Sequence, residues 1–389
     1  MKLYKSYSIK NILNTLIFTV SLLILLIFSK DNFESVKKSV SIFISNIIPS
    51  LFPFIFFTEF ILNTDILTTI QNSTGKIFSK LFSVTKKASP AIITGFLCGF
   101  PMGAKTVASL YEKDEISREE SENLLKFINN CNPAFILSTI GIGILYNIKL
   151  GLVLALSHYL ASVLIGILFC KKHSLNIIHK NEVNLNSFDK INLNLKQNIF
   201  EIVKKCIKNT LVTLGMILGF MIIFNLSFCI LSKFLIILNI NNNVISILSG
   251  IFEVTTGVKN VYESSLDLKI KLVFISFLLG FSGLCIICQI YSTISKYRFS
   301  FKKLLASKFI HGIFSMVITY ILINYTNIFN IDTISVYSQI DQVKRSYYVY
   351  NMKKAYLLST TLIIVFLLIY YIIQKKVAYK NIGYKKEGG

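Results

Sequence analysis

The sequence predicts an all-α integral membrane protein that crosses the bilayer several times. Hydrophobic residues make up 53% of the 389 residues, charged residues make up 15%, and the mean hydropathy is +0.62. Soluble domains carry about 25% charged residues, and a transmembrane helix needs about 20 consecutive apolar residues. At least eight stretches approach or exceed that length: Asn11–Phe28, Val40–Leu62, Phe127–Tyr146, Leu150–Cys170, Thr210–Leu231, Leu272–Ile290, Phe309–Tyr325 and Tyr356–Ile373.

Two further apolar stretches, Pro90–Gly103 and Phe234–Phe252, are short or interrupted. We expect broken or re-entrant helices there, which are stable in a membrane only where protein or water surrounds them. The first span, Asn11–Phe28, is long for a signal peptide and no A-x-A cleavage site follows it. We therefore interpret it as an uncleaved N-terminal transmembrane helix.

Composition changes along the chain predict five segments. We expect an N-terminal helix at 1–35, a first transporter half at 36–170, a basic cytoplasmic linker at 171–202 and a second transporter half at 203–325. The remaining residues, 326–389, hold a polar excursion, a last transmembrane helix and a basic tail. The cytoplasmic side is assigned to the lysine-rich segments because lysine and arginine favour cytoplasmic loops.

A weak internal repeat suggests that the two halves are similar. Val36-Lys-Lys-Ser matches Val203-Lys-Lys-Cys, and Gly95-Phe-Leu-Cys-Gly-Phe matches Ser276-Phe-Leu-Leu-Gly-Phe, at displacements of 167 and 181 residues. The hydrophilic segment Lys171–Lys208 lies between the copies. Transporters built from two such halves bind substrate near the bilayer midplane, where broken helices meet.

The net charge of +22 excludes little, because positive loops on one side of the membrane account for most of it. No basic helix or aromatic RNA-binding pattern is present, so we expect no nucleic-acid partner. The sequence also lacks H-E-x-x-H, Walker A and dinucleotide-binding motifs. We therefore expect that the protein is not an enzyme.

A serine protease is the one enzymatic alternative that the sequence raises. Gly280-Phe-Ser282-Gly283 matches the G-x-S-G of rhomboid-type intramembrane proteases, and His311 follows in the next apolar segment. A Ser–His dyad inside a membrane cavity is chemically sensible. The four-residue match is weak, and no oxyanion pattern accompanies it: His158 has Ser162 four residues on.

The stretch from Gly95 to Lys105 predicts a helix break with a cation beside it. Gly95, Gly99 and Gly103 allow another backbone to approach closely, and Pro101 disfavours a continuous helix. A helix that restarts here offers free N–H groups and a positive dipole end, which together with Lys105 predict an anion-binding site. The alternative is a tight helix hairpin in which Lys105 extends to the lipid headgroups.

Asn129, Asn130, Asn132 and Pro133 predict a second broken helix. Asn132 can cap a restarted helix, and Pro133 can occupy its first position. Amide side chains both donate and accept hydrogen bonds, so they suit carboxylates, ring nitrogens or hydroxyls. The alternative is an interfacial loop between two ordinary helices.

Two acidic residues lie in apolar surroundings, Glu59 in PFIFFTEF and Glu253 in GIFEVTTG. Ionisable residues inside a membrane are costly and usually functional. Glu253 with Thr256 and Gly257 could bind a coupling cation or proton. Equally, each acid could pair with a lysine near the interface.

The run GFPMGAKTVASLYEKDEISREESENLLKFINNCNPAFILSTIG, at 99–141, resembles the YlbJ-type sporulation integral membrane proteins. These belong to the nucleoside-recognition (Gate-type) superfamily, which is similar to concentrative nucleoside transporters, and the resemblance covers most of residues 35–325. It implies a role in sporulation, in the outer forespore membrane on the mother-cell side, and transport of dipicolinic acid towards the spore. Asn130-Cys131-Asn132-Pro133 departs from the Asn-Ser/Gly-Pro typical of the family.

Together these features predict a transporter of a small organic anion embedded in the lipid bilayer. Transport of nucleosides or nucleobases and a non-transporting scaffold for spore assembly remain the alternatives. The sequence implies no metal site or organic cofactor, and it leaves open the coupling ion (a proton or sodium) and homo-oligomerisation. The predicted substrate-binding residues are Gly99, Pro101, Gly103, Lys105, Asn129, Asn130, Asn132, Glu253 and Thr256.

Overall fold

The computed structural model describes residues 9–170 and 199–325, which contain helices and no strand. This confirms the all-α fold class. The expected last span, Tyr356–Ile373, lies outside the described residues, as do the polar excursion and most of the linker. Within the described ranges, five helical segments are long and apolar enough to cross a membrane: Ser29–Leu62, Ile148–Phe169, Ile199–Ile237, Leu268–Tyr297 and Phe301–Tyr325.

The first long helical segment continues through Pro49 and Pro53. After α1 (Ile9–Ile27), α2 (Ser29–Ile42) passes through a π-helical turn, η1 (Phe43–Ile47), into α3 (Ile48–Leu62). Pro49 lies in the first turn of α3, where a missing backbone N–H is tolerated. The wider π turn lets the helix absorb this change in geometry without ending.

Shorter helices and one more long helix complete the chain as far as the linker. These elements are α4 (Ile66–Phe82), η2 (Lys86–Ala88), α5 (Ser89–Leu97), α6 (Met102–Glu112), α7 (Arg118–Leu125), the π-helix η3 (Phe135–Ile144) and α8 (Ile148–Phe169). After the linker follow α10 (Ile199–Ile237), α11 (Asn242–Phe252), α12 (Val254–Glu263), α13 (Leu268–Phe281), α14 (Gly283–Ile294), η5 (Ser295–Tyr297) and α15 (Phe301–Tyr325).

The helix order recurs along the chain. Helices α5, α6 and α8 begin at residues 89, 102 and 148, and α11, α12 and α15 begin at residues 242, 254 and 301. The displacement is therefore 152 or 153 residues. It differs from the displacements of the short sequence matches, 167 and 181, because Gly95 lies in α5 whereas Ser276 lies in α13. The match of Gly95 with Ser276 therefore does not connect equivalent helices.

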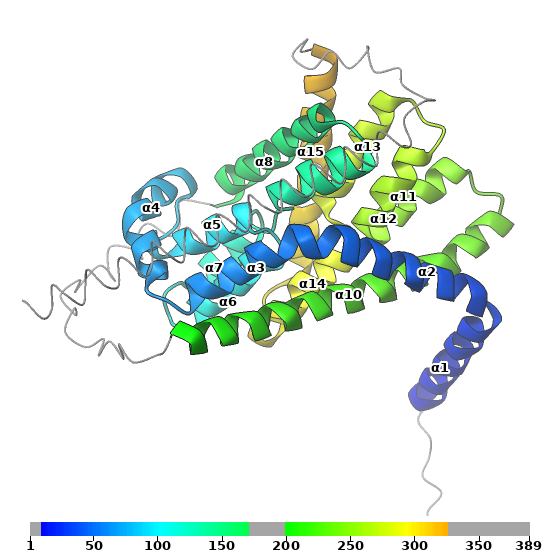
Figure 1. Cartoon of the computed structure of the whole chain (residues 1–389), viewed down its shortest axis with the longest axis horizontal. Helices are drawn as coiled ribbons and strands as arrows, with labels where there is room; N and C mark the ends of the chain where they lie inside the picture. The colour runs from blue at the N-terminus through cyan, green and yellow to red at the C-terminus, as the bar shows by residue number, and fades with distance from the viewer. Residues whose placement is uncertain (1–8, 171–198, 326–389) are drawn as a thin grey trace, which may run out of the picture.

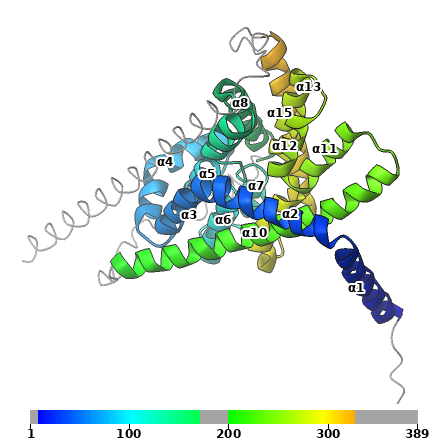
Figure 2. The same cartoon turned by 45° about the vertical axis from the view of Figure 1, so that its right-hand side comes forward.

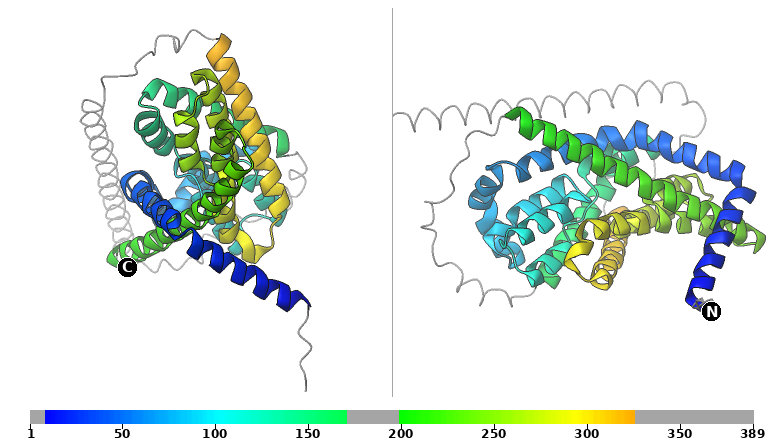
Figure 3. Two further views of the ribbon diagram at one scale, coloured as in Figure 1. Left: turned by 90° about the vertical axis from the view of Figure 1, so that its right-hand side faces the viewer. Right: turned by 90° about the horizontal axis from the view of Figure 1, so that it is seen from below.

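The two longest helical segments run beside each other across one side of the bundle. Figure 1 shows α2 and α3 lying along α10, and Figure 3 shows the same pair from below. Helix α1 leads away from the bundle at the end of α2, and α4 lies at the opposite end (Figure 2). Helices α8, α13 and α15 pack against one another on the far side of this pair.

The structure differs from the sequence-based elements at two places. The expected single span Leu272–Ile290 is interrupted between α13 and α14, because Ser282 and Gly283 have left-handed backbone conformations, with φ of +73° and +72°. Helix α10 begins at Ile199, so the last residues of the expected linker, 199–202, are already helical. Its lysines had suggested a hydrophilic connection.

The two predicted helix breaks are confirmed, and glycines hold them together. A Cβ atom on Gly95 would lie 2.2 Å from the carbonyl oxygen of Ile128, and one on Gly103 would lie 2.9 Å from Gly95 Cα. Gly99 has φ of +78°, and a Cβ there would lie 2.8 Å from Asn130 O. The glycine spacing therefore lets the hairpin of α5 and α6 approach the second broken segment closely.

We predict that Gly95→Ala destabilises the fold. Alanine is the better helix former, but here its methyl group would overlap a backbone carbonyl that cannot turn aside, and overpacking of this kind costs about 1–3 kcal/mol. Gly215→Ala in α10 is the matched control, because no described atom lies within 4 Å of its Cβ position. Thermal unfolding in detergent should show a lower midpoint for Gly95→Ala alone, and equal midpoints for the two variants would contradict the packing argument.

Candidate functional site

The backbone groups of the first helix break form hydrogen bonds with other groups of the protein. Between α5 and α6, the amide of Gly99 donates to Thr94 O at 3.0 Å and that of Phe100 donates to Asn130 O at 2.9 Å. A broken helix in a membrane must pair its backbone groups with other protein groups or water. Around Gly103, where the sequence predicted free N–H groups at the restarted helix, the amides are also used: those of Met102 and Gly103 donate to Gly99 O at 2.9 and 3.2 Å.

The second break lies between α7 and η3 and is held by side chains. Asn132 Oδ1 accepts from the amide of Phe135 at 2.6 Å, and its Nδ2 donates to Ser50 O at 3.2 Å. The amide of Cys131 donates to His158 Nε2 at 3.1 Å. Asn132 thus caps the restarted helix as expected, and it also ties this segment to α3.

Glu253 forms a third break, between α11 and α12. Its two carboxylate oxygens accept from the amides of Thr255 and Thr256, at 3.0 and 2.7 Å. The side chain is buried, so the dipole and amides of α12 stabilise its charge in place of water. The carboxylate is an N-cap, and it also faces a small pocket.

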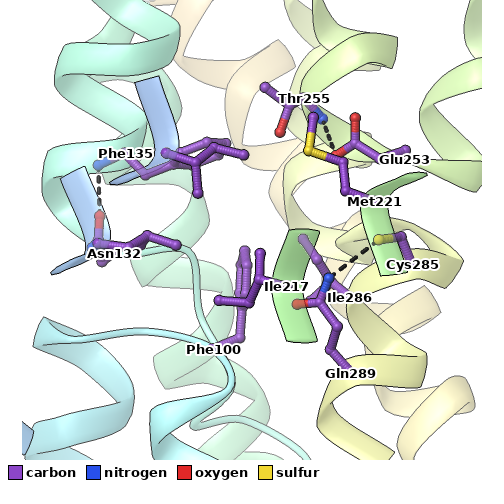
Figure 4. Close-up of a pocket in the computed structure, with 12 residues that line it drawn as sticks. Phe100, Asn132, Phe135, Ile217, Met221, Glu253, Thr255, Cys285, Ile286 and Gln289 are labelled. Carbon is purple, nitrogen blue, oxygen red and sulfur yellow. Dashed lines mark hydrogen bonds between the residues drawn. The ribbon is translucent and has the colours of Figure 1, made fainter. Parts of the chain in front are cut away.

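This pocket lies where the three breaks come together. Figure 4 shows Asn132 and Phe135 on one side, with Glu253 and Gln289 on the other. Its cavity volume is about 20 Å³, which is the space that one or two water molecules need. The lining residues are Ile47, Leu51, Phe100, Asn132, Phe135, Ile217, Met221, Glu253, Thr255, Cys285, Ile286 and Gln289.

Gln289 gives the pocket an unused hydrogen-bonding group. Its Nε2 donates to Cys285 Sγ at 3.2 Å, and sulfur is a weak acceptor. Its Oε1 is buried and has no hydrogen-bond partner among the described residues. Because a buried unpaired polar atom costs about 1–3 kcal/mol, Gln289 is suited to meet a water or a polar ligand.

Lys105 lies away from this pocket and is already paired. Its ammonium group forms an ion pair with Glu59 on α3, and Asn209 Nδ2 on α10 donates to the same carboxylate at 2.8 Å. The Glu59 side chain is 1% exposed and that of Lys105 is 30% exposed. This is the alternative in which an acid pairs with a lysine, and here it joins three helices.

The structure separates the predicted site residues into three groups. Asn132 and Glu253 line the pocket, whereas Lys105 pairs with Glu59. The others are not among the lining residues: Gly99, Pro101 and Gly103 form the first break, Asn129 and Asn130 are buried in the second, and Thr256 donates its amide to Glu253. Their roles in substrate binding stay predictions.

Sequence reasoning missed Phe100, Phe135, Thr255 and Gln289 as pocket residues. Aromatic residues are too common in this chain to stand out, but Gln289 had a usable signal as an amide within an apolar span. Lys308, in the apolar part of α15, had the same signal.

Ser282 and His311, the residues that suggested a protease, have other hydrogen-bond partners than each other. Ser282 Oγ accepts from Lys308 Nζ at 3.2 Å, whereas His311 Nε2 donates to the carbonyl of His158 at 2.9 Å. The two imidazole rings lie 4.5 Å apart between centroids. These groups form a second polar cluster, separate from the pocket.

We predict that Lys105→Ala destabilises the protein because it leaves the buried Glu59 carboxylate without its cation. Breaking a buried pair costs about 3–5 kcal/mol, and the partial exposure of Lys105 lowers this to roughly 2 kcal/mol. Adding Glu59→Gln should restore most of the thermal stability. A double variant as unstable as Lys105→Ala would show that the ion pair is not the cause.

A comparison with curated proteins finds similarity to the sporulation integral membrane protein YlbJ of Bacillus subtilis strain 168. The two are 27% identical over 319 residues, which cover 75% of this chain and 77% of that protein. No protein-family model matches the chain, and no solved structure matches it. The similarity supports the resemblance seen in residues 99–141 and indicates an integral membrane protein of a sporulating bacterium.

Proposed function

We propose that the protein is a membrane transporter that moves dipicolinic acid towards the forespore during sporulation. The observation that carries the transport proposal is the pocket at the meeting point of three helix breaks, inside a bundle of apolar helices. Irregular backbone at membrane depth is found where it lines a binding cavity or a pathway. A sporulation role is supported by the similarity to YlbJ.

The pocket suits a planar, polar ring in chemical type. Phe100 and Phe135 present aromatic surface, and Asn132 and Gln289 present amides that can bond to carboxylates or a ring nitrogen. Its present volume of about 20 Å³ is too small for such a molecule. Substrate binding therefore requires the helices around the pocket to separate, which fits a transporter that alternates between closed and open states.

One observation favours the nucleoside or nucleobase alternative. The residues that line the pocket include the Glu253 carboxylate and no lysine, arginine or histidine. A carboxylate with nearby amides binds hydroxyl and N–H donors directly, whereas a dianion beside it needs a compensating positive charge. Dipicolinate would then enter together with a proton or a cation.

The outer forespore membrane, on the mother-cell side, is the location that this function requires, because dipicolinate has to cross it to reach the spore. A scaffold function makes a different prediction about the pocket. If the protein served only in spore assembly, substitutions within the pocket that preserve folding would have no effect on transport or spore contents. The pocket variants below therefore separate the two functions.

We predict that Gln289→Leu lowers uptake of labelled dipicolinate into proteoliposomes about 10-fold or more, because the ligand loses hydrogen bonds worth about 1.5 kcal/mol or more. Leucine keeps the size of the side chain, so the helix should remain packed. Ser292→Ala is the matched control, because Ser292 lies one turn away on α14 and is exposed.

Competition with unlabelled uridine identifies the substrate class in the same vesicles. Uptake that dipicolinate inhibits and uridine does not supports the proposed substrate. If the vesicles take up uridine in a manner that depends on Gln289 and do not take up dipicolinate, the nucleoside alternative replaces the proposed substrate. Absence of both fluxes in the wild-type protein would contradict the transport proposal.

A further inference from the structure

Lys308 is a fully buried lysine in the apolar part of α15. Its side chain is 1% exposed. Its ammonium group donates to the carbonyl of Asn129 and, at 3.2 Å, to Ser282 Oγ. Both acceptors are neutral, and both belong to helix breaks. A charge at membrane depth is expensive, so a lysine held only by neutral groups calls for a functional explanation.

The surroundings of Lys308 contain no carboxylate partner. Among the described residues no ion pair includes it, and Glu122 on the neighbouring α7 is paired with Lys303 at 2.6 Å. The titratable groups that face the cluster are Cys131 before η3, His158 and Tyr159 on α8, and His311 on α15. A lysine amine gives up or takes up its proton according to such surroundings.

Two buried histidines lie beside Lys308, and one of them has a nitrogen that could still accept a hydrogen bond. His158 Nε2 accepts from Cys131 N, so its Nδ1 carries the hydrogen, whereas His311 Nε2 donates to His158 O, so its Nδ1 is an acceptor. Both Nδ1 atoms are buried and have no hydrogen-bond partner among the described residues. His311 lies one helical turn from Lys308, and because imidazole is a weaker base than an amine, Lys308 rather than a histidine holds the proton in this cluster.

The cluster lies between equivalent parts of the recurring helix pattern. Helices α8 and α15 are separated by 153 residues in sequence, and so are His158 and His311. Each histidine is followed four residues later by a serine, Ser162 or Ser315. Lys308 breaks this equivalence, because residue 155 in α8 is an alanine. The ammonium group of Lys308 therefore links a break in the first half of the chain, at Asn129, to a break in the second half, at Ser282.

We propose that Lys308 is the proton-binding residue that couples substrate movement to a proton gradient, an inference that rests on the proposed transport function. The charged lysine has three N–H donors and holds the breaks at Asn129 and Ser282 together. The neutral amine has two N–H groups and a lone pair, which is repelled by acceptors, so loss of the proton weakens this link. The proton enters from one side of the membrane and leaves to the other, and no other group is consumed.

Three variants in proteoliposomes test this role. Lys308→Met cannot bind the proton, Lys308→Arg cannot release it, and Lys303→Met is the matched control, an exposed lysine on the same helix. For each variant, counterflow of labelled dipicolinate at equal pH on both sides measures transport without a gradient. Accumulation under an imposed pH gradient, with a pH-sensitive dye inside the vesicles, measures coupling.

We expect both Lys308 variants to retain counterflow within about 3-fold and to lose gradient-driven accumulation by 10-fold or more, together with the dye signal. The Lys303→Met protein should match the wild type. The proposal would be overturned if the wild-type protein accumulated dipicolinate in response to a sodium gradient and not to a pH gradient. It would also be overturned if the Lys308 variants still accumulated dipicolinate in response to a pH gradient.

Loss of counterflow in both Lys308 variants would also overturn it, because the lysine would then be a structural or substrate-binding residue. Failure of the proposed function has a different signature. In that case the wild-type protein itself shows no counterflow of dipicolinate, whatever the gradient, and the coupling role falls with it.

Discussion

The whole site depends on one constraint: backbone groups freed by broken helices must find partners inside an apolar bundle. The bond from Phe100 N to Asn130 O joins the first two breaks directly, and the close approach at Gly99 makes it possible. The first break is therefore satisfied by the second, and the second and third by side chains of the protein, rather than by water. This mutual dependence fixes where the helix ends meet, and the pocket forms at that junction.

The same constraint explains why several polar residues look catalytic or ligand-binding in sequence but serve the scaffold. Asn132 uses its oxygen to cap η3 and its nitrogen to hold α3. Glu253 uses both oxygens on the amides of α12. These side chains still face the pocket, so binding a substrate means exchanging an internal hydrogen bond for one to the ligand. Such an exchange costs little in net free energy, which suits a carrier that must also release its substrate.

The sequence was sufficient for the fold class and for the breaks at Pro101 and Asn132, because proline, asparagine and glycine act on the local backbone. It was insufficient for the break at Ser282, whose only signal was a short Ser-Gly pair within an apolar run. The sequence predicted Lys105 as a binding residue but could not predict its ion pair with Glu59. That pair joins residues 46 positions apart, so it depends on how α3 and α6 pack. The pocket residues Phe100 and Gln289 come from distant segments, and no local pattern brings them together.

Three of the four buried charged residues in the described part of the chain are balanced by three different means. Glu59 is balanced by a lysine, Glu253 by helix amides, and Lys308 by a carbonyl and a hydroxyl. Helix amides and an opposite charge both stabilise the ion strongly, whereas neutral acceptors compensate an ammonium group less. Of these three, Lys308 is thus the charge that the protein can remove at the lowest cost. Because Lys308 lies outside the pocket, a proton that enters and leaves there would change how the breaks at Asn129 and Ser282 are joined, rather than the charge beside the substrate.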